Sequence, residues 1–209
     1  MYSIVNQKRY WNASYQICWV LKESNSRDGS FHVQRWVDTY LPVDKKVPRR
    51  IALSSYGILQ GAEDAEDLDA YDDEVKASLR DIAWINIGEH PGGSSTSWSR
   101  LEMLYAQNRI RVLAEMEAAK PDIVIFGGTC SLLWNDLVGG YFSYHLQHLH
   151  FHDESLDERA YPDADDEGPL FLEMPHPGVR KWRDQEYASR IIRMVSAWER
   201  GAYDLEMEW

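Results

Sequence analysis

The sequence has 209 residues, enough for a single compact domain over residues 1–209, and 44% of them are hydrophobic. No apolar run reaches the roughly eighteen residues of a membrane span, and the first ten residues lack the apolar centre of a signal peptide, so we expect a soluble cytoplasmic protein. The formal net charge of −12 argues against nucleic-acid binding, but two acidic segments, 63–74 and 153–167, hold sixteen of the 34 carboxylates. The rest of the chain has 18 acidic and 21 basic residues, which leaves room for a basic face.

The first apolar run, 17–21, predicts a buried strand. A polar segment follows it and offers four candidate side chains: Glu23, Ser24, Asn25 and Asp28. A helix is expected over 31–40, where apolar residues recur at near-helical spacing. The run 51–59 fits a strand or a helix equally well, and the acidic segment after it is expected to lead into a helix that ends near Arg80.

A second apolar run, 82–87, ends at Asn86 and passes into a loop rich in Gly, Pro and Ser. An apolar strand that leads into a glycine-rich turn and then a helix is typical of a ligand site in an open α/β sheet. The Asn86 side chain has two donors and one acceptor, so it suits the edge of a nucleobase, although a lone Asn at a strand end more often only forms a turn. The loop hydroxyls of Ser94, Ser95 and Thr96 suit a nucleic-acid backbone.

The second half of the chain predicts two helices and two strands. Apolar residues at helical spacing predict a long helix over 98–120, and a closing helix is expected over 184–198. The apolar runs 123–126 and 170–174 predict buried strands. The acidic segment 153–168 between these strands is expected to be an exposed loop.

Four strands separated by helices predict a mostly parallel sheet with helices on both faces. Because the carboxyl ends of parallel strands share one edge, we expect the tail after the first strand, Asn86, the glycine-containing segment 127–131 and His176 to gather there. Prolines on both sides of His176 restrict its backbone. Three basic residues follow and are expected to bind phosphate groups: Arg180, Lys181 and Arg183.

We expect no metal site and no cofactor. His148, His150 and His152 would share one face of a strand, but they have no cysteine partners or known ligand spacing, so we expect them to line the rim of the cleft. Cys18 and Cys130 lie in separate apolar segments, which argues against a disulfide framework. Two cysteines also cannot hold a four-cysteine iron–sulfur cluster.

Four segments, in order, resemble motifs of the uracil-DNA glycosylase superfamily. The segment 21–26 (LKESNS) stands where that superfamily has its catalytic loop, which reads Gly-Glu-Ala-Pro-Gly in one branch. The segment 84–87 (WINI) resembles the strand whose Asn reads the flipped base. The segment 120–128 (KPDIVIFGG) resembles a Lys-Pro strand that closes in glycine, and 176–178 (HPG) is similar to the final His-Pro-Ser loop.

The resemblance implies a three-layer α/β/α sandwich around a central, mostly parallel four-stranded sheet. It also implies a DNA glycosylase, which flips a nucleotide out of DNA and hydrolyses its N-glycosidic bond. We expect a monomer. A carboxylate, Glu23 or Asp28, would stabilise the positive charge on the sugar or position water, and His176 would hydrogen-bond to the departing base. The base-binding residues would be Ser24, Asn25 and Asn86.

The first loop departs from the family pattern, because it lacks the Gly and Pro, and Ser24 stands where a catalytic Asp or Asn is often found. Glu23, Asn25 or Asp28 could substitute for that residue, and the sequence does not choose among them. In uracil-specific relatives a bulky aromatic residue after the proline excludes larger bases. Asn25 and Ser26 stand there instead, so we expect a pocket enlarged for a modified pyrimidine, hydroxylated or glucosylated, as phages place in their DNA. The protein would then act in anti-phage defence, unless Trp36 or Tyr144 takes the place of the bulky aromatic residue and excludes larger bases.

Other functions remain open at this point. The protein could be a uracil or mismatch repair glycosylase, or a glycosylase-fold DNA-binding protein that lost catalysis with its altered first loop. The same sheet edge also suits an enzyme that acts on a nucleotide or a sugar phosphate. Lastly, the acidic segments 63–74 and 153–167 could serve an interaction protein that does not use the cleft.

Overall fold

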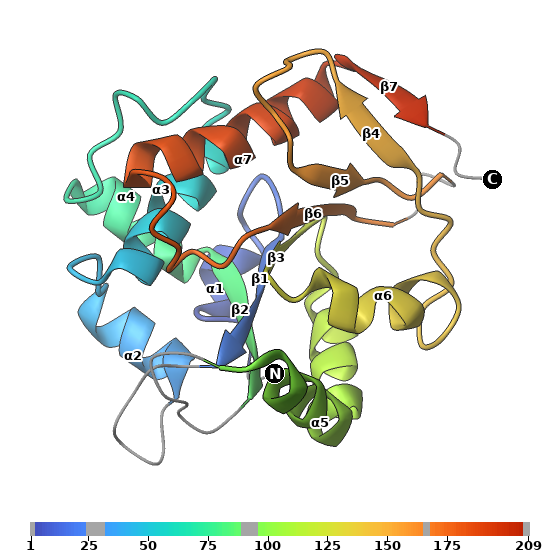
Figure 1. Ribbon diagram of the computed structural model, residues 1–209. Coiled ribbons are helices and arrows are strands. Elements are labelled where there is room, and N and C mark those ends of the chain that lie inside the picture. The colour runs from blue at the N-terminus through green and yellow to red at the C-terminus, as the bar shows by residue number, and fades with distance from the viewer. Residues whose placement is uncertain (1–2, 24–31, 89–95, 165–167, 207–209) are drawn as a thin grey trace.

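The computed structural model describes residues 3–23, 32–88, 96–164 and 168–206 (Figure 1). The strands there are β1 (Ile17–Glu23), β2 (Ile82–Gly88), β3 (Ile123–Gly127), β4 (His148–Phe151), β5 (Arg159–Tyr161), β6 (Leu170–Met174) and β7 (Tyr203–Glu206). The helices are α1 (Gln7–Tyr10), α2 (Val33–Tyr40), α3 (Lys46–Leu59), α4 (Asp73–Ala77), the 3-10 helix η1 (Ser78–Arg80), α5 (Trp98–Ala119), α6 (Cys130–Val138) and α7 (Asp184–Glu199). In this described part of the chain, no helix is both long enough and apolar enough to cross a membrane.

Five strands form one sheet in the order β2-β1-β3-β6-β5. The first four run parallel, and β5 runs antiparallel to β6 at the edge. Strand β1 is paired on both sides: Leu21 is in register with Asn86 of β2, and Val20 is in register with Phe126 of β3. Strands β4 and β7 pair antiparallel in a separate two-stranded sheet (Figure 1).

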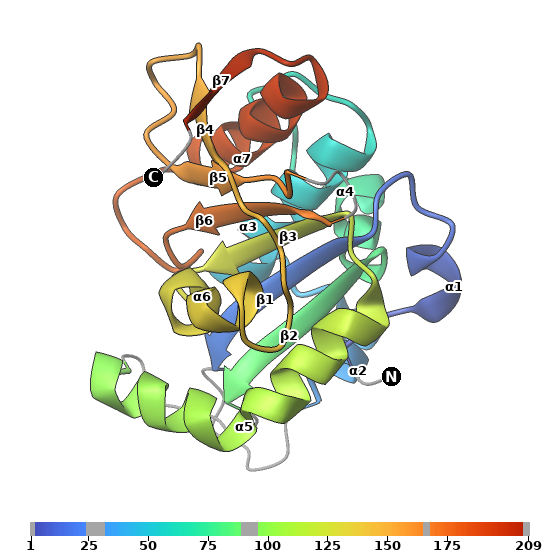
Figure 2. The same ribbon diagram turned by 90° about the vertical axis from the view of Figure 1, so that its right-hand side faces the viewer.

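The parallel strands are buried on both faces, which is why their sequences are nearly continuous apolar runs. Ile17 and Trp19 of β1 pack into a hydrophobic cluster with α3 and α7, whereas Cys18 and Val20 pack into a second cluster with α5 and α6. Figures 1 and 2 show the sheet between these two groups of helices. The chain is therefore an α/β protein in which helices cover both faces of a mixed, mostly parallel sheet.

The four predicted parallel strands are confirmed, and the two long helices are present as α5 and α7. The ambiguous run 51–59 is helical and belongs to α3. The predicted sheet of four strands is wrong, because β5 adds a fifth strand inside the segment expected to be an exposed loop. Ala160 of β5 is fully buried and is in register with Leu172 of β6. A strand of three residues has too little alternation to be recognised in a sequence, so its pairing with β6 decides its structure.

Candidate functional site

The carboxyl ends of the four parallel strands lie along one edge of the sheet, as predicted. Glu23, the last residue of β1, is in register with Gly88 at the end of β2. Gly127, at the end of β3, is in register with Met174 at the end of β6. Across the sheet, the edge presents in order Asn86, Glu23, the segment 127–131 and His176.

Glu23 is almost fully buried, with 4% of its side chain exposed. Its Oε1 accepts a hydrogen bond from the hydroxyl of Thr96, and Arg100 of α5 lies 3.7 Å from its Oε2. Among the residues that the structure describes, no donor makes a hydrogen bond to Oε2. An unsatisfied buried carboxylate oxygen is costly, so Oε2 is suited to accept a hydrogen bond from water or from a bound molecule. Thr96, predicted as a phosphate contact, holds Glu23 in place.

Asn86 is half-buried and shares one face of β2 with Trp84, two residues before it. The indole N–H of Trp84 donates a hydrogen bond of 3.0 Å to Oδ1 of Asn86. An indole can only donate, so this bond sets the orientation of the amide and leaves the two N–H donors of Nδ2 for another partner. The main chain is also held, because Arg111 of α5 donates to the carbonyl oxygens of Asn86 and Ile87 at 2.8 and 3.0 Å.

His176 lies between two prolines in the turn after β6. Its Nδ1 accepts a hydrogen bond of 3.0 Å from the main-chain N–H of Gly178, so the proton of the neutral ring is on Nε2. Burial lowers the pKa of His176 to about 4, with a smaller contribution from the positive charge of Lys22. At neutral pH the imidazole is therefore uncharged and offers Nε2–H as a donor.

Lys22 is a charged residue at this edge that the sequence did not single out. A Cβ added to Gly128 would lie 3.4 Å from Cε of Lys22 and 3.4 Å from the main-chain nitrogen of His176. Gly128 also has φ +72°, which disfavours any side chain. At Gly127 a Cβ would lie only 2.4 Å from a methyl of Leu21. Close packing thus accounts for both glycines, and it places Lys22 beside His176.

The turn before α7 exposes the three basic side chains predicted to bind phosphate: Arg180, Lys181 and Arg183. The ammonium of Lys181 lies 4.5 Å from the ring centre of Trp182, in a cation–π contact. The start of α7 itself is less suited to phosphate, because its first turn carries the carboxylates of Asp184 and Glu186. A phosphate contact here would therefore use the basic side chains rather than the helix amides.

Five predicted site residues lie outside the described residues: Ser24, Asn25, Asp28, Ser94 and Ser95. Their roles stay predictions. Ser97 follows this loop and caps α5, since its hydroxyl accepts a hydrogen bond of 3.4 Å from the main-chain N–H of Arg100. A capping role thus accounts for one hydroxyl of the serine-rich loop.

Metal and thiol chemistry have little support in the described residues. No group of three or more His, Cys, Asp or Glu side chains there is arranged to hold a metal ion. The rings of His148 and His150 are 4.7 Å apart, and both lie on β4, in the two-stranded sheet rather than in the sheet that carries the candidate site. Cys18 and Cys130 are buried, and burial raises the pKa of both thiols, so neither is a reactive thiolate.

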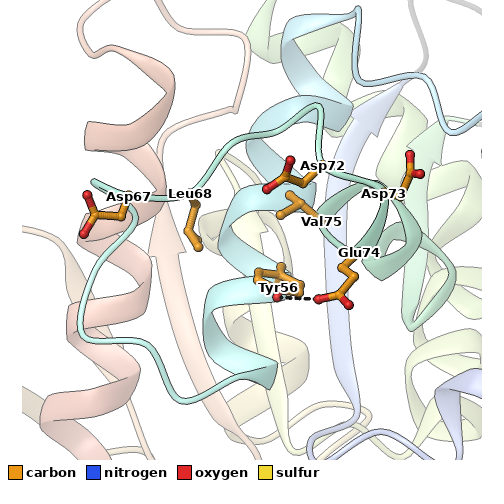
Figure 3. A pocket seen from close by; sticks show the side chains of 7 residues that line it. All are labelled: Tyr56, Asp67, Leu68, Asp72, Asp73, Glu74 and Val75. Atoms are coloured by element: carbon orange, nitrogen blue, oxygen red, sulfur yellow. Dashed lines mark hydrogen bonds between the residues drawn. The ribbon is translucent and has the colours of Figure 1, made fainter.

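A separate acidic pocket of about 270 Å³ is formed by α3, α4 and the segment between them (Figure 3). Its lining residues are Tyr56, Asp67, Leu68, Asp72, Asp73, Glu74 and Val75. The hydroxyl of Tyr56 donates a hydrogen bond of 3.1 Å to Glu74. Four carboxylates repel phosphate, and no lining residue comes from the strand ends, so this pocket is not part of the candidate site.

The residues that support the site are not among those predicted from the sequence. Trp84 could have been found, because alternation along a strand places it on the same face as Asn86. Arg50 could not, since it stands in a basic run that reads as solvent-exposed (KKVPRR) and yet is fully buried.

The arrangement combines a buried carboxylate, two oriented hydrogen-bond donors and a neighbouring cation along one sheet edge. A comparison with known protein families and a search of curated proteins both find no match for this chain. The chemistry of the site therefore carries the functional argument.

Proposed function

We propose that the protein is a DNA glycosylase with a uracil-DNA glycosylase-like fold, which hydrolyses the N-glycosidic bond of a flipped-out nucleotide. The observation that carries the proposal is a pair of oriented donors. Among the described residues, the bond from Trp84 leaves Nδ2 of Asn86 available as a donor, and the bond from Gly178 sets Nε2–H of His176. Glu23 ends the strand β1, which lies between the strands of these two donors. Donors for the base and a carboxylate for the sugar are what base excision requires.

Hydrolysis breaks the bond between the sugar C1′ and a ring nitrogen of the base. Positive charge develops on the sugar and negative charge on the base, and water supplies the hydroxyl to C1′ and a proton to the base. Neutral His176 donates a hydrogen bond to an oxygen of the departing base, and the charge of Lys22 adds stabilisation nearby. A carboxylate stabilises the sugar or orients the attacking water; Oε2 of Glu23 is suited to this role, and Asp28 is the alternative.

We propose that the base is a pyrimidine, as in the superfamily that the sequence resembles. Two oriented donors are compatible with the acceptors that a pyrimidine offers at O2 and at O4 or N3. We favour a modified pyrimidine, hydroxylated or glucosylated, because Asn25 and Ser26 replace the bulky aromatic residue of the uracil-specific relatives. The biological role would then be anti-phage defence. Repair of uracil or of mismatches is the alternative for the same site.

DNA binding would use the exposed cations of the turn before α7 and Arg100, half of whose side chain is exposed at the start of α5. These cations flank the strand ends that carry His176 and Glu23. The acidic pocket lies elsewhere, on α3 and α4, so the net negative charge of the chain is compatible with a DNA-binding edge. The proposed partner is therefore DNA.

The test is a glycosylase assay on single-stranded and duplex DNA that contains uracil, hydroxymethylcytosine or glucosylated hydroxymethylcytosine. An alkali-sensitive break at the modified base supports the proposal. DNA binding without a break would indicate a binding protein that has lost catalysis. Hydrolysis of free nucleotides without affinity for DNA would indicate a nucleotide enzyme, and action on uracil alone would indicate repair.

A further inference from the structure

Arg50, in α3, is fully buried and surrounded by acceptors from the turn after β6. Its Nη1 donates to the carbonyl oxygens of Pro177 and Val179, at 2.9 and 3.0 Å. Its Nη2 donates to the carbonyl oxygen of Trp182, and its Nε donates to the carboxylate of Asp184 at 2.8 Å. One side chain thus binds three main-chain carbonyls of this turn and the first residue of α7.

Two further side chains fasten the same turn. The hydroxyl of Tyr187, in α7, donates a hydrogen bond of 2.8 Å to the carbonyl oxygen of Pro175. The ammonium of Lys46 donates one of 2.8 Å to Val179. The guanidinium of Arg50 also lies 4.9 Å from the ring centre of Tyr187, a cation–π contact. The carbonyls immediately before and after His176 are therefore both bonded to buried side chains.

Stability alone does not explain an arginine at this position. A buried guanidinium loses its hydration, and a well-packed apolar side chain is often as stabilising as a buried ion pair. The planar guanidinium can, however, hold several carbonyl oxygens at once, which an apolar side chain cannot. The segment 175–183 has no helix or strand of its own, so these bonds define its shape. The N–H of Gly178, which sets the imidazole tautomer, belongs to the same segment.

We propose that Arg50 is a positioning residue for His176, and that Tyr187 assists it. Together they hold the turn so that Nε2–H of the imidazole has one location at the sheet edge. The inference rests on the proposed function, in which this donor stabilises the departing base. The placement matters, because a displacement of about 1 Å at a reacting group can cost about a hundredfold in rate.

Tyr187→Phe tests the inference with little change in packing, since it removes one hydroxyl and keeps the ring. Tyr105→Phe is the matched control, because the buried hydroxyl of Tyr105 donates to Asp136 on the opposite face of the sheet. We expect both variants to lose thermal stability, and the control to lose at least as much, because Tyr105 donates to a carboxylate and Tyr187 to a neutral carbonyl. Only Tyr187→Phe should lower kcat, and KM for DNA should not change. We expect a loss of about fivefold, because that corresponds to the net free energy of one hydrogen bond.

Arg50→Lys is the stronger test, because lysine keeps the positive charge but has its three donors on one nitrogen, so it cannot replace the bonds to three carbonyls and Asp184 together. Arg109→Lys, which alters the ion pair of Arg109 with Asp136, is its control. We expect Arg50→Lys to lower kcat by about a hundredfold with little change in KM. The titration midpoint of His176, followed by NMR, should rise from about 4 as the ring gains contact with water.

An unchanged kcat and an unchanged imidazole titration in folded Arg50→Lys would overturn the positioning role. Equal loss of kcat in the test and control variants would also overturn it, since the effect would then be one of general stability. If Arg50→Lys does not fold, the comparison of Tyr187→Phe with Tyr105→Phe decides. If the wild-type protein cleaves no glycosidic bond, the proposed function fails, but the imidazole titration still decides whether Arg50 positions His176.

Discussion

The indole N–H of Trp84 donates a hydrogen bond of 3.0 Å to Oδ1 of Asn86, from the same face of β2. The bond selects one of the two orientations of the amide, because an indole nitrogen cannot accept. The hydrogen bond from Gly178 to His176 does the same for the imidazole tautomer. At both ends of the candidate site, a neighbouring group therefore determines which atom is presented as a donor.

Replacing Trp84 should disturb the site without unfolding the protein. In Trp84→Phe the amide of Asn86 loses its fixed orientation, and we expect turnover to fall by about tenfold, less than for loss of a donor. Discrimination between pyrimidines should weaken too. Trp19→Phe is the control, since the indole of Trp19, on the neighbouring strand β1, donates a similar bond of 3.1 Å to the hydroxyl of Ser55 in α3. Equal turnover in the two variants would contradict the orienting role of Trp84.

The two proposed donors should be needed for catalysis but not for folding. We expect Asn86→Ala and His176→Ala each to reduce turnover by about a hundredfold, which is the typical loss for one oriented donor. Both side chains are only partly buried, so thermal unfolding should change little. Steady-state assays on the preferred DNA would measure the loss. Wild-type rates in both variants would exclude this edge as the active site.

The lowered pKa of His176 should make the folded protein less stable as the pH falls. Its pKa is lowered from 6.5 to about 4, so the unfolded state binds more protons between these values. The stabilisation from the neutral ring is complete above pH 6.5 and is lost as the pH falls toward 4. Lys22→Met removes a positive neighbour and should raise the pKa, although not to 6.5, because burial is the larger cause. NMR titration of the imidazole measures both values; a midpoint near 6.5 in the wild-type protein would contradict the partial desolvation of the ring.

The basic turn should contact phosphates rather than bases. Neutralising Arg180, Lys181 or Arg183 singly should weaken binding to all DNA sequences alike and lower the salt slope by about one unit. Lys120→Gln is a suitable control, because Lys120 is an exposed lysine at the end of α5. Affinity measured over a range of salt concentrations tests this. An unchanged slope, or a loss that depends on the base sequence, would argue against the assignment.

Much of the fold could be predicted because its signals are local. The strands 17–21 and 123–126 are apolar runs, and their burial on both faces of a parallel sheet follows from that composition. The helix over 98–120 follows from its apolar spacing. The shared edge of Glu23, Asn86 and His176 followed from the parallel direction of the strands alone.

Other features depend on partners that lie far away in the chain. Strand β5 is too short to be recognised before it pairs with β6. Thr96 binds Glu23 across 73 residues of sequence, so it supports the carboxylate, and its predicted phosphate contact stays a prediction. These outcomes needed the fold, because no local pattern identifies the partner.

By itself, the sequence determined the α/β class, the parallel strand ends and the residue types gathered there. The tertiary structure decided which of their atoms are hydrogen-bonded and how the side chains are oriented. Arg50 and Pro177 are 127 residues apart, yet the bond between them helps to shape the turn of His176. The lowered pKa of His176 likewise comes from burial, which exists only once the chain has folded. Hydrophobic periodicity is a local property of the chain, whereas burial and hydrogen-bond partners are set by segments that meet only in the folded protein.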